Sequence, residues 1–137
     1  MKHKVLLALC AALLFSASAS AHHSFDATYY FDREVQLEGK IVQALIRNPH
    51  CFLHFQAPDD TGVMQVWAVE WQSAGKLGKQ GIHRDTLQVG DEVTILINPS
   101  RRPPDHRGVL TSLARKSDGF EWAERHKKDR AKRNRQI

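Results

Sequence analysis

The sequence predicts an all-β protein built as a small five-stranded OB-like barrel, with one short helix between strands 3 and 4. Three observations predict this fold class. Apolar and polar residues alternate with period two in roughly five short segments. Clusters of Gly, Pro, Asn and Asp separate most of these segments. A helix-like stretch of long polar residues follows the third segment, which gives the element order of an OB-fold. A small sandwich or another short barrel would show similar periodicity.

The first strand begins at Glu34. Its alternating positions are Val35, Leu37, Gly39 and Ile41. Val42 and Leu45 shift the phase of the alternation, which indicates a β-bulge. Gly39 at the centre fits a strand that bends sharply, as barrel strands do. Asn48-Pro49 ends the strand.

The second strand, residues 50–57, and the third, residues 63–71, flank a turn at 58–62 whose Pro-Asp-Asp-Thr-Gly sequence is typical of turns. One face of the second strand carries Cys51, Leu53, Phe55 and Ala57, and one face of the third carries Val63, Trp67, Val69 and Trp71. These two faces are expected to line the core.

The second half of the chain supplies the helix and two more strands. Residues 72–80 contain two glycines and one chief apolar residue, Leu77, and predict a short, imperfect helix. Residues 93–97 and 109–116 predict strands 4 and 5, joined by a loop rich in proline and arginine, and a turn then leads into residues 120–122. The predicted core comprises Cys51, Leu53, Phe55, Trp67, Val69, Val93, Ile95 and Ile97.

Residues 1–21 are typical of a cleaved secretory signal peptide. Lys2 and Lys4 precede an uncharged apolar stretch, and the segment ends in Ala-Ser-Ala at 19–21. The apolar stretch is shorter than the roughly 20 residues that span a bilayer. Cys10 lies within the apolar stretch rather than at its end, which is atypical of a lipoprotein. We therefore expect a periplasmic protein that begins at His22 and does not span the membrane.

The charge is distributed unevenly. Of the net charge of +5, the leader carries +2 and the tail at 124–137 carries +5, which leaves −2 for residues 22–123. Nucleic-acid binding would need a positive groove with aromatic platforms on the domain itself, so this distribution argues against it. We expect the tail to be a frayed helix or disordered, and either solvated or in contact with anionic envelope surface. The predicted organisation is an N-terminal arm at 22–33, a barrel domain at 34–123 and this basic tail.

The arm mixes polar and aromatic residues without steady periodicity, so we expect it to be extended and to dock through Phe25, Tyr29 or Phe31. Cys51 is the one cysteine of the mature chain, which excludes an internal disulfide and favours burial. No Ser-His-Asp pattern, phosphate loop, CxxC or HExxH is present, so an enzyme is not expected and no catalytic residue is assigned.

The sharpest candidate site is created by cleavage before His22. A free α-amine followed by His22 and His23 provides the nitrogen donors that copper(II) prefers. His50, at the start of the second strand, could complete the site if the arm folds back across the barrel. The alternatives are solvated histidines in the arm and a turn-stabilising role for His50. His54 is too far along the strand, about 13 Å, to share an ion with His50 comfortably.

Glu70 lies near the end of the third strand, between two apolar residues. A carboxylate there could be a metal ligand, a base or an anchor for the following helix. Capping or salt-bridging is the preferred interpretation.

Several motifs stand in an order that resembles a family of small exported bacterial proteins catalogued only as a domain of unknown function. They are HHSF at 22–25, LxGxI at 37–41, NPH at 48–50, WAxE at 67–70, Gly81, RDxL at 84–87 and GDxV at 90–93. The resemblance implies a signal peptide and a compact barrel-like domain in the periplasm, and it implies no activity. Gln72-Ser73-Ala74-Gly75 departs from the Gly-Ser-Pro-Asn expected there, and the basic tail is additional.

The expected function is therefore a periplasmic, non-enzymatic binding module that holds copper(II) through His22, His23 and His50. One alternative is an envelope structural or interaction protein that uses the barrel loops and the basic tail. The other is an accessory domain of a periplasmic oxidoreductase system.

Overall fold

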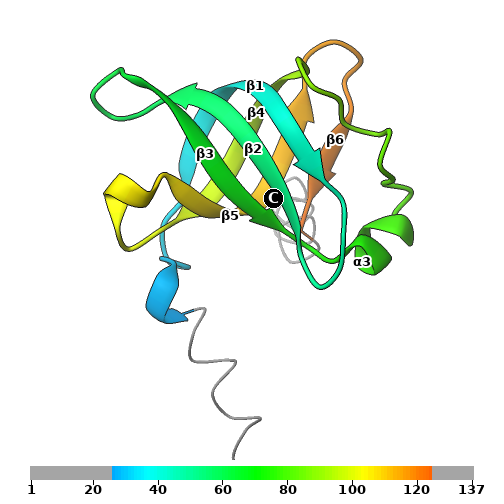
Figure 1. The fold of residues 1–137 in the computed structure, drawn as a ribbon, viewed down its shortest axis with the longest axis horizontal. Coiled ribbons are helices and arrows are strands. Elements are labelled where there is room, and N and C mark those ends of the chain that lie inside the picture. The colour runs from blue at the N-terminus through cyan, green and yellow to red at the C-terminus, as the bar shows by residue number, and fades with distance from the viewer. Residues whose placement is uncertain (1–25, 125–137) are drawn as a thin grey trace, which may run out of the picture.

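A single sheet curls into a closed barrel in the computed structural model, which describes residues 26–124 of the chain (Figure 1). Its elements are β1 (Val35–Leu45), β2 (Cys51–Pro58), β3 (Met64–Trp71), α3 (Ala74–Gly78), β4 (Glu92–Pro99), the 3₁₀ turn η1 (Pro103–Asp105), β5 (Arg107–Arg115) and β6 (Glu121–Ala123). Antiparallel pairing gives the order β3-β2-β1-β4-β5-β6. The predicted signal peptide, His22, His23 and the tail beyond Glu124 lie outside the described residues.

The barrel closes where β3 meets β5 in parallel. Three residue pairs make this closure, namely Ala68–Arg107, Val69–Gly108 and Glu70–Val109. β1 to β5 therefore form the predicted five-stranded barrel, with α3 between β3 and β4 as expected for an OB-like fold.

β1 is curved enough to pair with both β2 and β4. Its register with β2 shifts between Ile41 and Gln43, which confirms the predicted bulge. A Cβ at Gly39 would lie 2.0 Å from the backbone oxygen of Gln56, so a side chain at this position would collide with β2. The glycine lets the two strands approach at the bend.

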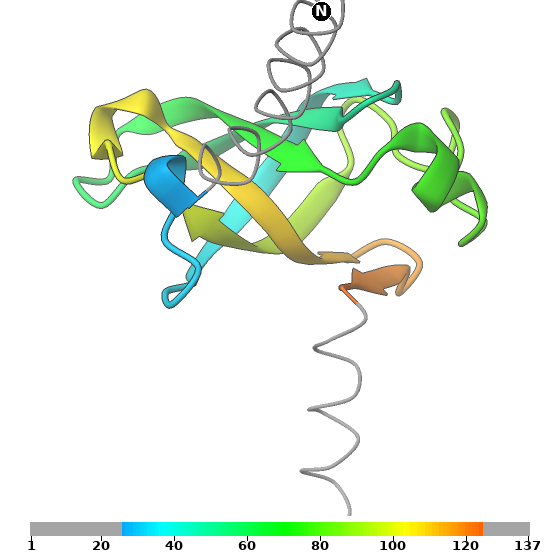
Figure 2. The ribbon, with the colours of Figure 1, turned by 90° about the horizontal axis from the view of Figure 1, so that it is seen from below.

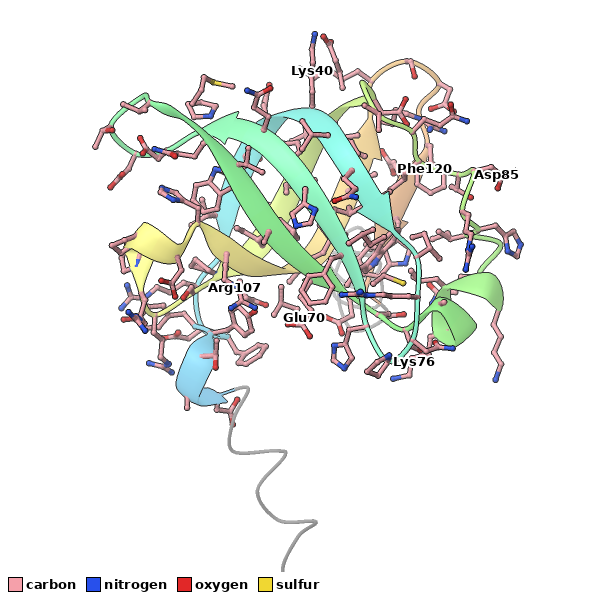
Figure 3. All side chains as sticks on the ribbon, in the orientation of Figure 1. Lys40, Glu70, Lys76, Asp85, Arg107 and Phe120 are labelled. Atoms are coloured by element: carbon pink, nitrogen blue, oxygen red, sulfur yellow. The ribbon has the colours of Figure 1, made fainter. Side chains whose placement is uncertain are left out.

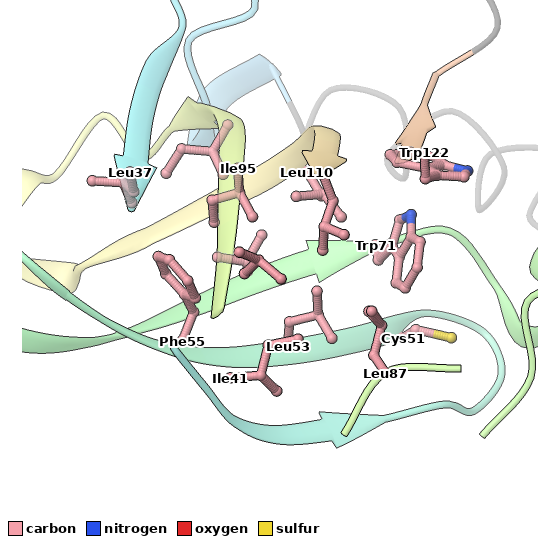
Figure 4. Close-up of a cluster of buried hydrophobic side chains, with 14 of the residues drawn as sticks. Leu37, Ile41, Cys51, Leu53, Phe55, Trp71, Leu87, Ile95, Leu110 and Trp122 are labelled. Atoms are coloured by element: carbon pink, nitrogen blue, oxygen red, sulfur yellow. The ribbon is translucent and has the colours of Figure 1, made fainter. Parts of the chain in front are cut away.

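The inward faces of the strands meet in one apolar core, shown in Figure 4. Seven of the eight predicted core residues are at most 1% exposed: Cys51, Leu53, Phe55, Val69, Val93, Ile95 and Ile97. Cys51 is a free, buried thiol whose Sγ donates to the backbone oxygen of Arg47 at 3.3 Å, and burial raises its pKa. The eighth, Trp67, is only partly buried because it lies at one end of the core.

Three expectations differ from the structure in detail. Val63 is 55% exposed and precedes β3, because its N–H donates to the Asp59 side chain and keeps it within the turn. Residues 26–28 are helical rather than extended, and Arg101 donates to the carbonyl oxygens of Asp26 and Thr28 at the end of this turn. Residues 121–123 form β6, which pairs with β5 and buries Trp122 against Trp71.

The two ends of the barrel carry different elements. Figures 1 and 2 place α3 at one end and η1, with the described part of the arm, at the other. Ser73 caps α3 by accepting from the N–H of Lys76 at 3.3 Å, and the buried Leu77 packs the helix on the core. No helix within residues 26–124 is long and apolar enough to cross a membrane.

Candidate functional site

A carboxylate on the outer face of the barrel connects the arm to the loop before β2. Glu70 is only 9% exposed and lies opposite Phe52 on the neighbouring strand (Figure 3). Its Oε2 accepts a hydrogen bond from the Tyr29 hydroxyl at 3.1 Å, and its Oε1 pairs with Nδ1 of His50. The preferred sequence interpretation, a salt-bridging Glu70, agrees with this geometry, while the partners themselves come from distant parts of the chain.

His50 is held in one orientation by this contact. Because an ionised carboxylate can only accept, Nδ1 of His50 is the donor toward Glu70. In the neutral ring Nε2 then carries the lone pair, which is the electron pair with which an imidazole ligates a metal. The His50 side chain is 41% exposed, so the ring borders solvent. A shallow hollow beside it is lined by Arg47, Asn48, Pro49, His50, Phe52 and Glu70.

Tyr29 anchors the arm, as one of the three docking residues that the sequence suggested. Its side chain is 2% exposed and its backbone forms an antiparallel bridge with Ser100. Burial raises the pKa of the Tyr29 hydroxyl, and the nearby Glu70 charge raises it further, while Arg107 opposes the shift. Phe31 is 48% exposed, and Phe25 lies outside the described residues. The neutral Tyr29 hydroxyl is therefore a stable donor to Glu70.

The structure brings together only part of the predicted metal site. His50 meets Glu70, while His22 and His23 lie outside the described residues. Within residues 26–124, no group of three or more His, Cys, Asp and Glu side chains could hold a metal ion. His54 lies apart from His50 and is hydrogen-bonded to Gln43 at 2.8 Å.

A groove at the η1 end of the barrel was not anticipated from the sequence. Its volume is about 620 Å³, and residues from the arm, β1, the β2–β3 turn and the β4–β5 loop line it. Trp67 forms part of the lining, and His106 lies against it edge to face at 5.1 Å. The incomplete burial of Trp67 reflects this groove. The only signal in the sequence that could have pointed to this groove was the proline- and arginine-rich composition of the loop at 98–108.

Comparison with known proteins identifies a family and no activity. The model of a family described as "Family of unknown function (DUF6152)" matches residues 10–109, which is most of the chain. This confirms the resemblance to a family of unknown function. No curated protein and no solved structure matches the chain.

Proposed function

The chain belongs to the DUF6152 family of unknown function, and from that starting point we propose that it is an exported, non-enzymatic binding module for a transition metal ion, with copper(II) the best fit. The proposed ligands are the new α-amine, His22, His23 and His50. One observation carries the proposal: Glu70 contacts both Tyr29, which docks the arm, and His50, which faces solvent beside it. The arm that bears two histidines is thus anchored next to a third.

Chain length permits the arm to complete the site. Six residue steps separate His23 from Tyr29. The three steps before residue 26 can each advance at most ~3.6 Å, and the three through the helical turn at 26–28 advance about 1.5 Å each, so His23 can reach roughly 15 Å from Tyr29. The Tyr29 hydroxyl and His50 share the Glu70 carboxylate, which is well within this range. The arm can therefore carry its histidines to His50 without leaving its docked position.

The donor set favours copper(II). An amine and three imidazoles form a nitrogen-rich set, and copper ranks highest in intrinsic affinity among divalent first-row metals. Glu70 would serve as the carboxylate that orients a ligating histidine, since such ligands commonly donate their second ring N–H to a carboxylate or carbonyl. Tyr29 in turn holds Glu70 in position.

Copper(II) titration followed by calorimetry tests the proposal. The protein that starts at His22 should bind one equivalent at least about tenfold more tightly than a free peptide of residues 22–30, a difference of ~1.4 kcal/mol. His50→Ala should lower the affinity to that of the peptide, and Glu70→Gln should weaken it about tenfold. His54→Ala, which removes the nearby histidine that is bonded to Gln43, is the matched control and should change nothing.

Two further results would decide the matter. Binding should weaken as pH falls, because protons compete for the amine and imidazole nitrogens. Equal affinity of the folded protein and the free peptide for copper(II) would overturn the proposal, since any peptide with this N-terminus would then bind copper(II) as tightly as the protein does.

A further inference from the structure

The first half of β3 has a free edge. β3 pairs with β2 along its whole length, from Met64 to Trp71, but β5 joins its other side only from Ala68 onward (Figure 1). Among residues 26–124, no strand covers that side of residues 64–67. The sheet therefore ends at this part of β3.

The backbone groups of Met64 and Val66 point out of this edge, away from β2. The bonds on either side of them set the direction. The C=O of Val63 accepts from the N–H of Asp59 within the β2–β3 hairpin at 2.9 Å, and the N–H of Ala68 donates to the loop before β5 at 2.9 Å. Because backbone groups alternate in direction along a strand, odd-numbered residues here bond to β2 and even-numbered residues face the edge. No described residue bonds to the backbone of Met64 or Val66.

This edge lacks the features that keep free edges from pairing. Natural sheets protect such edges with charged side chains, proline or a bulge. Residues 61–69 contain no charged residue and no proline, and their pairing with β2 shows no register shift. Val63, Met64 and Val66 are each more than half exposed. An apolar and unprotected edge of this kind indicates a surface that another strand covers.

The edge is complementary to itself. Two copies related by a two-fold axis through Gln65 would place Met64 of each copy opposite Val66 of the other. Residues paired in this way in an antiparallel sheet exchange both of their N–H···O bonds, so all the free groups of the two residues would be satisfied. The Met64 and Val66 side chains would also meet across the strands on the outer face, where apolar pairs stabilise a sheet.

The charges beyond the paired residues are complementary as well. Because β5 occupies the other half of the edge, the β2–β3 turn of one copy would meet the η1 segment of the other. The turn at 58–62 holds two aspartates and no basic residue, whereas residues 101–107 hold three arginines and one aspartate. Asp60 is exposed and forms no ion pair within the described chain. The Arg102 side chain is 83% exposed, and its contact with Asp105 is long, at 3.9 Å. Each copy thus offers an acidic turn to a basic segment of the other.

We propose that the protein forms a two-fold symmetric dimer in which the β3 edges of two copies pair antiparallel around Gln65. The pairing joins the two barrels through one continuous sheet and covers the exposed side chains of Val63, Met64 and Val66. Small interfaces give weak, reversible complexes, so the fraction of dimer should rise with protein concentration. The dimer needs neither copper nor His50, so it is independent of the proposed function.

Disulfide trapping tests the register of this pairing. The two Gln65 residues would lie opposite each other as a non-hydrogen-bonded pair, with Cα atoms about 4.5 Å apart, a separation that a disulfide spans. Under mild oxidation the exported Gln65→Cys protein should therefore form a covalent dimer on non-reducing electrophoresis. Gln56→Cys, exposed on β2, is the matched control. It should give at most about a tenth as much, because three strand spacings of ~4.8 Å would separate its two copies. Cys51 is buried and should not react in either variant.

Sedimentation velocity on the exported protein, between about 5 and 500 µM, measures the strength of the dimer. EDTA is included so that metal-bridged dimers do not contribute. Val66→Lys should raise the dissociation constant at least about tenfold, because a lysine on an edge opposes strand pairing and the two-fold axis introduces it twice. Val89→Lys makes the same change at a valine that is 73% exposed in the loop before β4, and it should leave the constant within about twofold. Circular dichroism verifies that both variants fold.

Any one of three results would overturn the proposal. A wild-type protein that stays monomeric over the whole range would leave the edge to an extended segment of another protein. Equal covalent dimer in Gln65→Cys and Gln56→Cys would exclude the register. Equal dissociation constants for Val66→Lys and Val89→Lys would place the interface on another surface. His50→Ala should not change dimerisation, so a failure of copper binding and a failure of strand pairing can be told apart.

Discussion

Asp59 shows how one side chain can organise a turn that also borders the groove. Its Oδ1 accepts from the N–H and hydroxyl of Thr61 at 2.9 and 2.6 Å and from the N–H of Val63 at 3.1 Å. Its Oδ2 accepts from Gln65 at 3.1 Å and lies 3.6 Å from His106. Donors led by the Thr61 hydroxyl stabilise the carboxylate and lower the pKa of Asp59 to about 2, from an ordinary 3.8.

A pH-dependent contribution to stability follows for Asp59. The folded pKa is below the unfolded one, so the contribution is complete above the ordinary pKa and is lost as pH falls from about 4 to about 2. Asp59→Asn should therefore destabilise the protein most near neutral pH, and the difference from wild type should shrink toward pH 2. Urea unfolding at several pH values measures this, with the exposed Asp60→Asn as control. A difference that stayed constant over the range would contradict the assignment.

Gly39 gives a second prediction at the residue scale. Gly39→Ala should destabilise the barrel by about 1–3 kcal/mol or more, because its Cβ would lie 2.0 Å from the Gln56 oxygen. The matched control is Gly75→Ala, where a Cβ meets nothing within 4 Å and a helical position favours alanine. Chemical denaturation of both variants gives the comparison. Equal stability of Gly39→Ala and wild type would mean that β1 and β2 can separate at the bend.

At the scale of elements, the sequence predicted strands better than it predicted their ends. Alternation located β1 to β5 because each has an apolar face on a shared core. It missed β6, since three residues are too few to show a period, although Trp122 is 4% exposed there. It also extended β3 back to Val63, because the capping of the turn by Asp59 is not visible in a hydropathy pattern.

For the candidate site, too, the sequence predicted individual residues better than it predicted how they come together. His50, Glu70 and Tyr29 were each singled out from local sequence, but their meeting was not predicted. Tyr29 and Glu70 are 41 residues apart, and their contact depends on where the arm crosses the closed barrel. Sequence periodicity reports the face on which a residue lies and does not report which distant segment will cover it.

The boundary between β6 and the tail supports a prediction about surface binding. The tail at 125–137 lies outside the described residues and holds seven Lys and Arg residues against one Asp, a net charge of +6. We expect weak adhesion to vesicles containing anionic lipid that fades over a few hundred millimolar salt, as the screening length falls to several Å. Deletion of residues 125–137 should abolish adhesion without altering the circular-dichroism spectrum, because it preserves the backbone bond between Glu124 and Thr111.

A longer deletion separates the surface-binding role of the tail from the structural role of β6. Removal of residues 121–137 should also lower the thermal midpoint, since it takes away Trp122, which contacts Trp71 edge to face at 5.1 Å and donates to Gln80 at 2.9 Å. If the shorter deletion also unfolded the domain, the tail would have a structural role.

On the scale of the whole molecule, the chain divides into a slightly acidic barrel domain flanked by two basic segments. The barrel holds one buried thiol and no disulfide among the described residues, so its stability rests on the apolar core and on sheet closure. The described part of the arm and the β4–β5 loop lie at one end of the barrel (Figure 2). The loop before β2 lies next to α3, where the N–H of Ala74 donates to the Arg47 oxygen at 3.1 Å. Glu70 connects the two through Tyr29 and His50.

Processing of the N-terminus is the prediction at this scale. Intact-mass measurement of the exported protein should give a chain that begins at His22, because Ala-Ser-Ala at 19–21 fits the cleavage pattern. An intact mass that included residues 1–21 would contradict both export by cleavage and the α-amine of the proposed copper site. An Ala21 variant that blocks cleavage should lose the tight copper binding, while circular dichroism should still show a folded β-rich domain.

The pairing of β3 with β5 also dictates when the fold can be completed during synthesis. β5 begins at Arg107 and ends at Arg115, so a ribosome must make most of the chain before the barrel has its closing strand. Contacts that are distant in sequence form slowly because the intervening loop must first be ordered. The nascent chain therefore stays open until late in translation, which is the state that a translocation channel accepts. On the proposed export route, a late-closing barrel would keep the chain open until passage across the membrane is under way.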